Sequence, residues 1–207
     1  MKDVSVKYTK TGVPFVIVDD FFNGFESEQL LAELEFVRPH LSGSGETGGA
    51  VSLVDGSNLK LNNSMWLNDF FSDPKKSTVY NLTRQFYDPD LLFEIGQETW
   101  IMRYLENYPA ADALQILYYE QNSSYDTHLD RAFLTYLYWT HKEPKKFEGG
   151  DLVLEEDSRV EYRKNRLVIF PSPTKHRVTS VKMTERSEGH GRYCISNFVH
   201  LNTLADF

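Results

Sequence analysis

The residues of this chain best suited to chemistry are a histidine and an aspartate two positions apart, together with one distant histidine. His128 and Asp130 stand in Tyr-Asp-Thr-His-Leu-Asp, and His176 stands in Thr-Lys-His-Arg-Val. Alternate residues of an extended chain point to the same side, so His128 and Asp130 would share a face of a strand. Two histidines and one carboxylate suit non-haem Fe(II), because three metal positions stay open. The pattern predicts an iron site, although a surface histidine beside a turn aspartate would have the same local sequence.

Short β-strands separated by turn residues are expected to position these ligands. Apolar or alternating runs bounded by Gly, Pro and polar residues favour an antiparallel sandwich or barrel. The stretch between Asp130 and His176 has room for about four strands with turns, which would return the chain to the opposite side of a barrel. The expected strands span residues 113–120, 133–139, 152–154, 159–162, 167–170, 175–181 and 192–201.

The N-terminal half is expected to add helices to this sheet. Residues 13–22 predict a buried strand, and residues 25–37 predict a helix whose start Ser27 could cap. A second helix is expected over residues 74–87, where Pro stands in the first turn, and a short one over residues 91–95. These helices would cover one outer face of the sheet, so the predicted fold class is mainly β with flanking helices.

Residues 41–64 have the composition of a long loop, rich in Gly, Ser and Asn. A segment of this kind in a compact domain is either disordered or a lid over a functional site. No internal repeat is evident, and we expect residues 1–207 to form a single domain.

Composition bounds the class of protein. The net charge of -8 disfavours a general nucleic-acid or anionic-membrane surface. Cys194 is the single cysteine, which excludes an internal disulfide framework and a cysteine zinc site. The polar N-terminal residues do not resemble a signal peptide, and no apolar run is long enough to span a membrane. The expectation is a soluble cytoplasmic protein.

The order of these features resembles that of the 2-oxoglutarate- and Fe(II)-dependent oxygenases. Within that family, it is most similar to the prolyl 4-hydroxylase-like group. The shared order is His-x-Asp, a tyrosine-rich strand, Gly149-Gly150, an apolar strand ending in Phe-Pro, a distal histidine, and an arginine in the last strand. The resemblance implies a double-stranded β-helix, or jelly roll, with Fe(II) held by the equivalents of His128, Asp130 and His176. It implies 2-oxoglutarate and O2 as cosubstrates, succinate and CO2 as products, and ascorbate as a reductant. An aspartate at this ligand position, Asp130, resembles the pattern of the hydroxylases in this family rather than that of its halogenating members.

The family also implies a basic residue that binds the far carboxylate of 2-oxoglutarate. Spacing from His176 favours Arg186, whereas the strand pattern favours Arg192, since residues 182–191 have the composition of a long hairpin turn. We expect Arg192 to be the anchor, on a strand face shared with Cys194, Ser196 and Phe198. Tyr138 is expected to add a hydrogen bond to the cosubstrate, and Tyr118 resembles a pocket tyrosine. Core packing is the alternative for both tyrosines.

The substrate is expected to be a prolyl residue in a peptide or protein. Phe198 stands where several prolyl hydroxylases have tryptophan in the substrate pocket, and Arg131 either faces the substrate or is a solvated loop arginine. A free amino acid or another small molecule is the alternative substrate. Nucleobase demethylation is disfavoured because Phe198 occupies the position of a second arginine. A metal-binding jelly roll without turnover is the alternative from another class.

Overall fold

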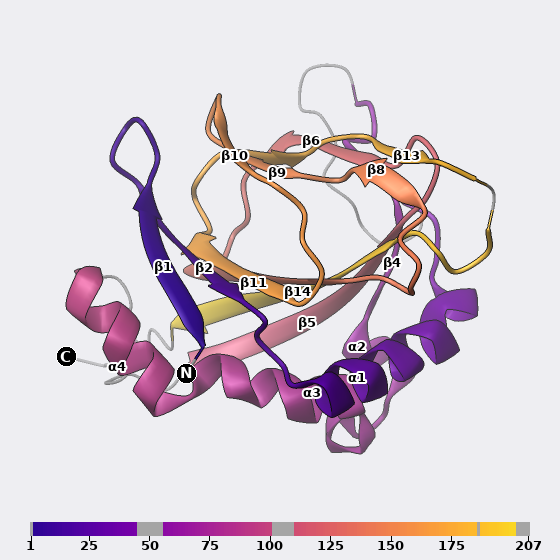
Figure 1. Ribbon diagram of the computed structural model, residues 1–207, viewed down its shortest axis with the longest axis horizontal. Coiled ribbons are helices and arrows are strands. Elements are labelled where there is room, and N and C mark those ends of the chain that lie inside the picture. The colour runs from indigo at the N-terminus through magenta and orange to yellow at the C-terminus, as the bar shows by residue number, and fades with distance from the viewer. Residues whose placement is uncertain (1, 45–55, 101–109, 186, 202–207) are drawn as a thin grey trace.

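Two antiparallel β-sheets face each other, and helices cover the outer side of the larger one (Figure 1). The computed structural model describes residues 2–44, 56–100, 110–185 and 187–201. The larger sheet has the order β1-β2-β11-β7-β14-β5-β4. These strands are β1 (Asp3–Tyr8), β2 (Pro14–Asp19), β4 (Asn63–Trp66), β5 (Ala110–Tyr119), β7 (Leu134–Thr140), β11 (Arg166–Pro171) and β14 (Arg192–Leu201).

The smaller sheet lies opposite and carries the two histidines of interest. Its order is β10-β9-β12-β6-β3, and a two-stranded ribbon of β13 and β8 accompanies it. Its strands are β3 (Lys60–Leu61), β6 (Ser124–His128), β9 (Leu152–Leu154), β10 (Ser158–Val160) and β12 (His176–Val178), and those of the ribbon are β8 (Phe147–Gly149) and β13 (Val181–Met183). The expected double-stranded β-helix with flanking helices is confirmed.

The larger sheet is buried on both faces, and each face has its own hydrophobic core. Every residue of β7 is buried. Tyr136 and Tyr138 point into the core on the helix side, whereas Leu137 and Trp139 point into the core between the sheets. Side chains alternate along a strand, so a shift of one residue moves a side chain from one core to the other.

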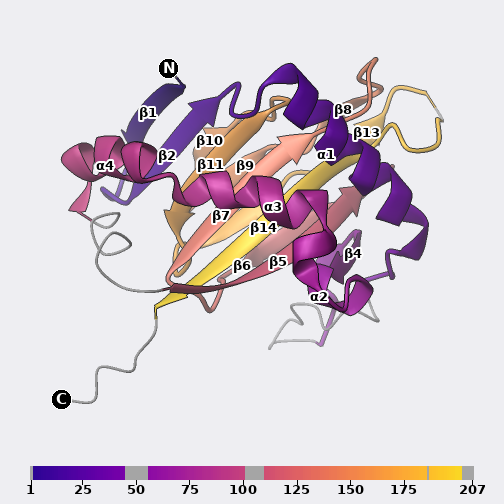
Figure 2. The same cartoon turned by 90° about the horizontal axis from the view of Figure 1, so that it is seen from below.

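The helices form a layer across the outer face of the larger sheet (Figure 2). This layer contains α1 (Gly24–Val37), α2 (Leu67–Phe70), α3 (Thr78–Thr83) and α4 (Pro89–Glu98), with 3-10 turns at Arg38–His40, Pro74–Lys76 and Arg84–Tyr87. The prediction that Ser27 caps α1 is wrong, because Asn23 and Glu26 form a capping box at its start. The predicted single helix over residues 74–87 consists of a 3-10 turn, the short helix α3 and a second 3-10 turn. Ser77 caps the start of α3.

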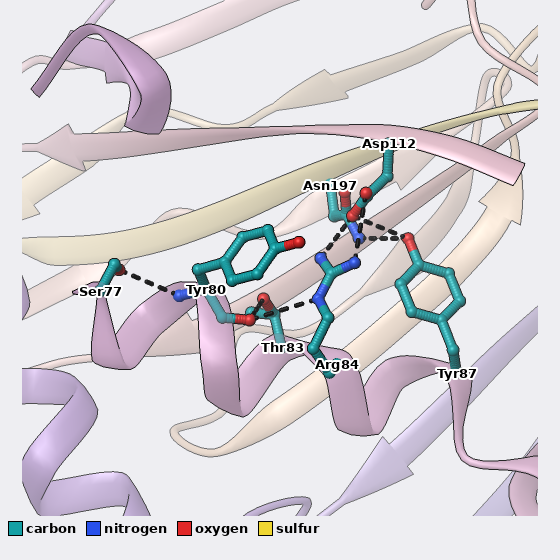
Figure 3. A network of polar contacts seen from close by, with 7 residues as sticks. All are labelled: Ser77, Tyr80, Thr83, Arg84, Tyr87, Asp112 and Asn197. Atoms are coloured by element: carbon teal, nitrogen blue, oxygen red, sulfur yellow. Dashed lines mark hydrogen bonds and ion pairs between the residues drawn. The ribbon is translucent and has the colours of Figure 1, made fainter. Parts of the chain in front are cut away.

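A buried polar network joins this helix layer to the sheet (Figure 3). The Arg84 guanidinium donates to both carboxylate oxygens of Asp112 on β5, over 3.2 and 2.5 Å. The Tyr87 hydroxyl donates to Asp112 over 3.2 Å and accepts from the Asn197 amide over 2.6 Å. The helix layer is thus fixed to β5 and β14, two strands that also face the space between the sheets.

Part of the expected loop is strand, since β3 lies within residues 41–64, β4 begins at Asn63, and Ser42 pairs with Ser64. The prediction of a lid falls in part on residues 45–55, which lie outside the described residues. No helix in the described part of the chain is long and apolar enough to cross a membrane. The single-domain organisation stays a prediction.

Candidate metal centre

The three residues proposed as iron ligands come together at one end of the space between the sheets. His128 ends β6 and His176 begins β12, and the two are direct partners in the antiparallel ladder. Asp130 follows β6 immediately, with its carboxylate oxygens 3.7 Å from His128 Nε2 and 3.4 Å from His176 Nε2. One ligand atom from each residue lies within 4.8 Å of the others. Two imidazole nitrogens and a carboxylate at this separation fit a single divalent metal ion such as Fe(II).

Neighbouring groups fix the orientation of each candidate ligand. The Nδ1 atoms of His128 and His176 lie 2.7 and 2.9 Å from the carbonyl oxygens of Asp126 and Thr174. A carbonyl only accepts, so each Nδ1 carries the proton and each Nε2 offers its lone pair. The Thr135 hydroxyl donates to the Asp130 carboxylate over 2.7 Å. The ligand atoms are therefore arranged for a metal before one binds.

Burial keeps both imidazoles neutral. It lowers the pKa of His176 to about 4, and burial, with the nearby His176 as a second cause, lowers the pKa of His128 to about 4. Burial also raises the pKa of the Asp130 carboxyl. Neutral imidazole is the form that binds a metal, so these histidines need lose no proton at neutral pH.

A cavity with about 410 Å³ of empty space opens beside the triad and reaches into the larger sheet. Arg192, Cys194, Ser196 and Phe198 line it from β14, as the shared strand face predicted. We call this space the chamber.

Arg192 lies at the inner end of the chamber without a counter-ion. Its side chain is fully buried, and all three guanidinium nitrogens lack a hydrogen-bond partner among the described residues. The guanidinium carbon lies 4.8 Å from the ring of Tyr119, 5.1 Å from that of Trp139 and 5.4 Å from that of Tyr162. A buried cation without a partner is costly, so this position is suited to a ligand that brings a carboxylate.

Gly150 leaves the room in which the arginine lies. A Cβ atom added there would come within 2.6 Å of Arg192 Cδ, and the glycine has a φ of +76°, which other residues rarely adopt. The Gly149-Gly150 pair noticed in the sequence therefore shapes the wall of the chamber.

The two tyrosines expected at the cosubstrate lie on the other face of the larger sheet. Tyr138 packs in the helix-side core and donates its hydroxyl hydrogen bond to Asn165 over 3.0 Å. Tyr118 is in the same core and accepts a hydrogen bond from the Gly191 amide over 3.0 Å. The structure therefore corrects the expected contacts of both tyrosines with the cosubstrate. The tyrosines that line the chamber are Tyr119, one position along β5, and Tyr125 on β6.

Of the remaining residues predicted for the site, one lines the chamber, one does not and one lies outside the described residues. Phe198 lines the chamber, and its ring lies 5.8 Å from that of Trp66. Arg131 is exposed and is not among the described residues that line the chamber. Arg186 lies outside the described residues. Sequence reasoning missed Gln115, a buried β5 residue that lines the chamber, because a polar side chain inside a strand gives no signal of its own.

The jelly roll, the His-Asp-His triad and the buried arginine in the same chamber agree with the arrangement that the sequence resemblance to 2-oxoglutarate- and Fe(II)-dependent oxygenases implies. Residues 114–200 match the family model of the 2OG-Fe(II) oxygenase superfamily. The matched segment is less than half of the chain, and it contains all three candidate ligands and Arg192, so this part of the chain is similar to that superfamily.

Solved structures of similar fold include two prolyl hydroxylases. A Pseudomonas putida prolyl-4-hydroxylase is 17% identical with a TM-score of 0.56, over 90% of this chain and 92% of that one. A viral collagen prolyl hydroxylase from Paramecium bursaria Chlorella virus-1 is 15% identical with a TM-score of 0.55, over 89% and 94% of the two chains. A full-length Neurospora crassa protein, solved in complex with alpha-ketoglutarate, is 15% identical with a TM-score of 0.55, over 91% and 74%. These identities show a shared fold alone, and no curated protein matched the chain by sequence.

Proposed function

We propose that this chain is a 2-oxoglutarate-dependent Fe(II) dioxygenase that hydroxylates a C–H bond of a prolyl residue in a peptide or protein. The observation that carries the proposal is Arg192, a buried cation without a partner in the same chamber as the three ligand atoms. In this proposal His128, Asp130 and His176 hold Fe(II). Arg192 binds the far carboxylate of 2-oxoglutarate.

The chain's own residues would bind the metal and the cosubstrate, orient them and exclude water from them. Bound Fe(II) and 2-oxoglutarate would supply the oxidising chemistry with O2, giving succinate and CO2, and ascorbate would keep the iron reduced. Arg192 would fix one end of the cosubstrate through two parallel hydrogen bonds, in surroundings where rings replace water. Thr135 would hold the Asp130 carboxylate in place while the metal exchanges its other ligands.

Two observations support a catalytic role and a peptide substrate. A metal-binding module without turnover would not need a buried arginine that lacks a partner, which favours cosubstrate binding. Phe198 lines the chamber near the Trp66 ring, and Leu129, between two of the ligands in the sequence, is 52% exposed. Apolar side chains of this kind near the ligands suit a prolyl ring. Two of the solved structures with this fold are named as prolyl hydroxylases.

The test is succinate formation by the full chain loaded with Fe(II), with proline-containing peptides compared with free amino acids. We expect peptide-stimulated succinate formation, a hydroxylated proline located by mass spectrometry, and no turnover by His176→Ala. The proposal is overturned if a free amino acid is hydroxylated with tight coupling and no peptide is. Full activity of His176→Ala would overturn the metal assignment.

A further inference from the structure

Gln115 is a buried polar residue of the chamber that the roles above do not use. Its side chain is 6% exposed and lines the chamber from β5. Among the described residues, no hydrogen bond engages its amide, and its polar atoms are not among those enclosed without a partner. The amide is therefore open to the chamber, where a bound ligand can form hydrogen bonds with it.

The pairing of the strands places Gln115 at the metal end of the chamber. Ser196 is the direct partner of Gln115 on β5 and of Leu137 on β7. Phe198, two residues further along β14, is paired with Thr135, the residue whose hydroxyl holds Asp130. Arg192 lies four residues in the opposite direction, which corresponds to roughly 13 Å along a strand. Gln115 and Ser196 thus lie near the triad and away from the arginine.

The face of β5 and β14 that lines the chamber therefore has two polar ends with an apolar middle. Arg192 is paired with Tyr119 at the inner end, Cys194 with Leu117 in the middle, and Ser196 with Gln115 at the outer end. The inner end is cationic and suits a carboxylate. The outer end offers a neutral amide and a hydroxyl, which donate and accept hydrogen bonds.

We propose that Gln115, with Ser196 beside it, binds a neutral carbonyl of the substrate next to the reacting C–H bond, and so selects a peptide group over a free carboxylate. This inference rests on the proposed function. Arg192 is the only lysine or arginine among the described residues that line the chamber, and it lies at the other end. A free amino acid would bring a carboxylate to an end of the chamber whose described lining has no lysine or arginine. A peptide carbonyl needs only a hydrogen-bond donor, which the amide of Gln115 supplies.

The experiment compares Gln115→Leu and Gln115→Glu with the wild-type chain. Gln97→Leu is the matched control, because it makes the same change on the exposed face of α4. For each protein we would measure the affinity for 2-oxoglutarate by the absorption of its Fe(II) complex, the KM for the peptide, and the fraction of succinate formed without hydroxylation.

Loss of one neutral hydrogen bond should raise the peptide KM of Gln115→Leu about three- to tenfold. The uncoupled fraction should also rise, and affinity for 2-oxoglutarate should change less than about twofold. Gln115→Glu keeps the side-chain size but repels a carbonyl, so it should show the same pattern even if the leucine variant folds poorly. Gln97→Leu should match the wild type.

The outcomes separate this inference from the proposed function. An unchanged peptide KM and coupling in both variants would overturn the role of Gln115 while the hydroxylase assignment stands. Weaker 2-oxoglutarate binding with unchanged peptide KM would place Gln115 at the cosubstrate instead, which also overturns it. If no peptide stimulates the wild-type chain, the peptide assignment fails and the inference falls with it.

Discussion

Arg192 is held by aromatic rings and by the backbone of a glycine rather than by an acid. The rings of Tyr119, Trp139 and Tyr162 lie within 5.4 Å of its guanidinium carbon, and their faces attract a cation. These contacts stabilise the charge without using its hydrogen-bond donors. The five N–H groups stay available for a carboxylate, which is what an anchor for a dicarboxylic acid requires.

Replacing this arginine separates the two candidate anchors. Arg192→Ala should raise the apparent constant for 2-oxoglutarate by at least about thirtyfold, because a buried bidentate contact is worth roughly 2–5 kcal/mol. Arg186→Ala should change it little, because the sequence predicts a hairpin turn there and a solvated charge contributes within about 1 kcal/mol. Succinate formation at increasing 2-oxoglutarate concentration measures both. The opposite result would assign the anchor to Arg186.

Lys60 gives the chain a pH dependence of stability that can be measured. Its side chain is 2% exposed, and burial lowers its pKa from 10.5 to about 8. Between about pH 8 and 9.5 the folded state releases this proton while the unfolded state keeps it, so the free energy of unfolding should rise with pH. The rise should reach about 2 kcal/mol for this group.

Urea unfolding of the wild type and of Lys60→Met at each pH isolates this contribution. Other groups titrate alike in the two proteins, so the difference between their free energies of unfolding reports Lys60. We expect the variant to lack the rise and to be the more stable of the two near pH 7. Parallel curves would show that the lysine is solvated in the folded state.

At the scale of elements, the network between the turn at Arg84–Tyr87 and the sheet connects the helix layer to β5 and β14. Tyr87→Phe removes a hydroxyl that donates to Asp112 and accepts from Asn197. Asn197 is fully buried, and its Oδ1 already lacks a partner among the described residues. We expect a loss of about 1–2 kcal/mol in the free energy of unfolding by urea.

Tyr8→Phe is the matched control for this change. The Tyr8 hydroxyl also donates a hydrogen bond, to the Glu98 carbonyl over 3.1 Å, but the residue is 57% exposed. Water replaces that bond when it is lost, so the cost should stay within about 0.5 kcal/mol. Equal losses in the two variants would show that the buried network adds nothing beyond a surface bond.

The strands explain why sequence reasoning found the triad but chose the wrong tyrosines. The spacing of His128 and Asp130 is local, and the last turns before His176 are marked by prolines, so these positions could be read directly. Tyr118 and Tyr138 lie in strands buried on both faces. Such strands have large apolar side chains on both faces and lack the alternation that tells one face from the other. A register error of one residue was therefore undetectable in the sequence.

At the scale of the whole molecule, the fold class and the long strands could be predicted, whereas short edge elements could not. β3 has two residues and β4 has four, and the predicted loop over residues 41–64 includes all of β3 and the first half of β4, because Gly, Ser and Asn are frequent there. Their pairing with β6 and β5 depends on contacts far along the chain, which local composition does not report. The two sheets they extend enclose the chamber between them.

A cation reserved for one end of a dicarboxylic acid cannot distinguish a cosubstrate from the product made from it. In the proposed function, succinate keeps the carboxylate that Arg192 would bind. The carboxylate beside the keto group leaves as CO2, and the keto carbon becomes the second carboxylate of succinate. We expect succinate to inhibit competitively with 2-oxoglutarate, and Arg192→Lys to weaken both. Noncompetitive inhibition would contradict this. With competitive inhibition, the rate would follow the ratio of 2-oxoglutarate to succinate. The enzyme would therefore slow wherever succinate accumulates, even when the molecule to be hydroxylated is abundant.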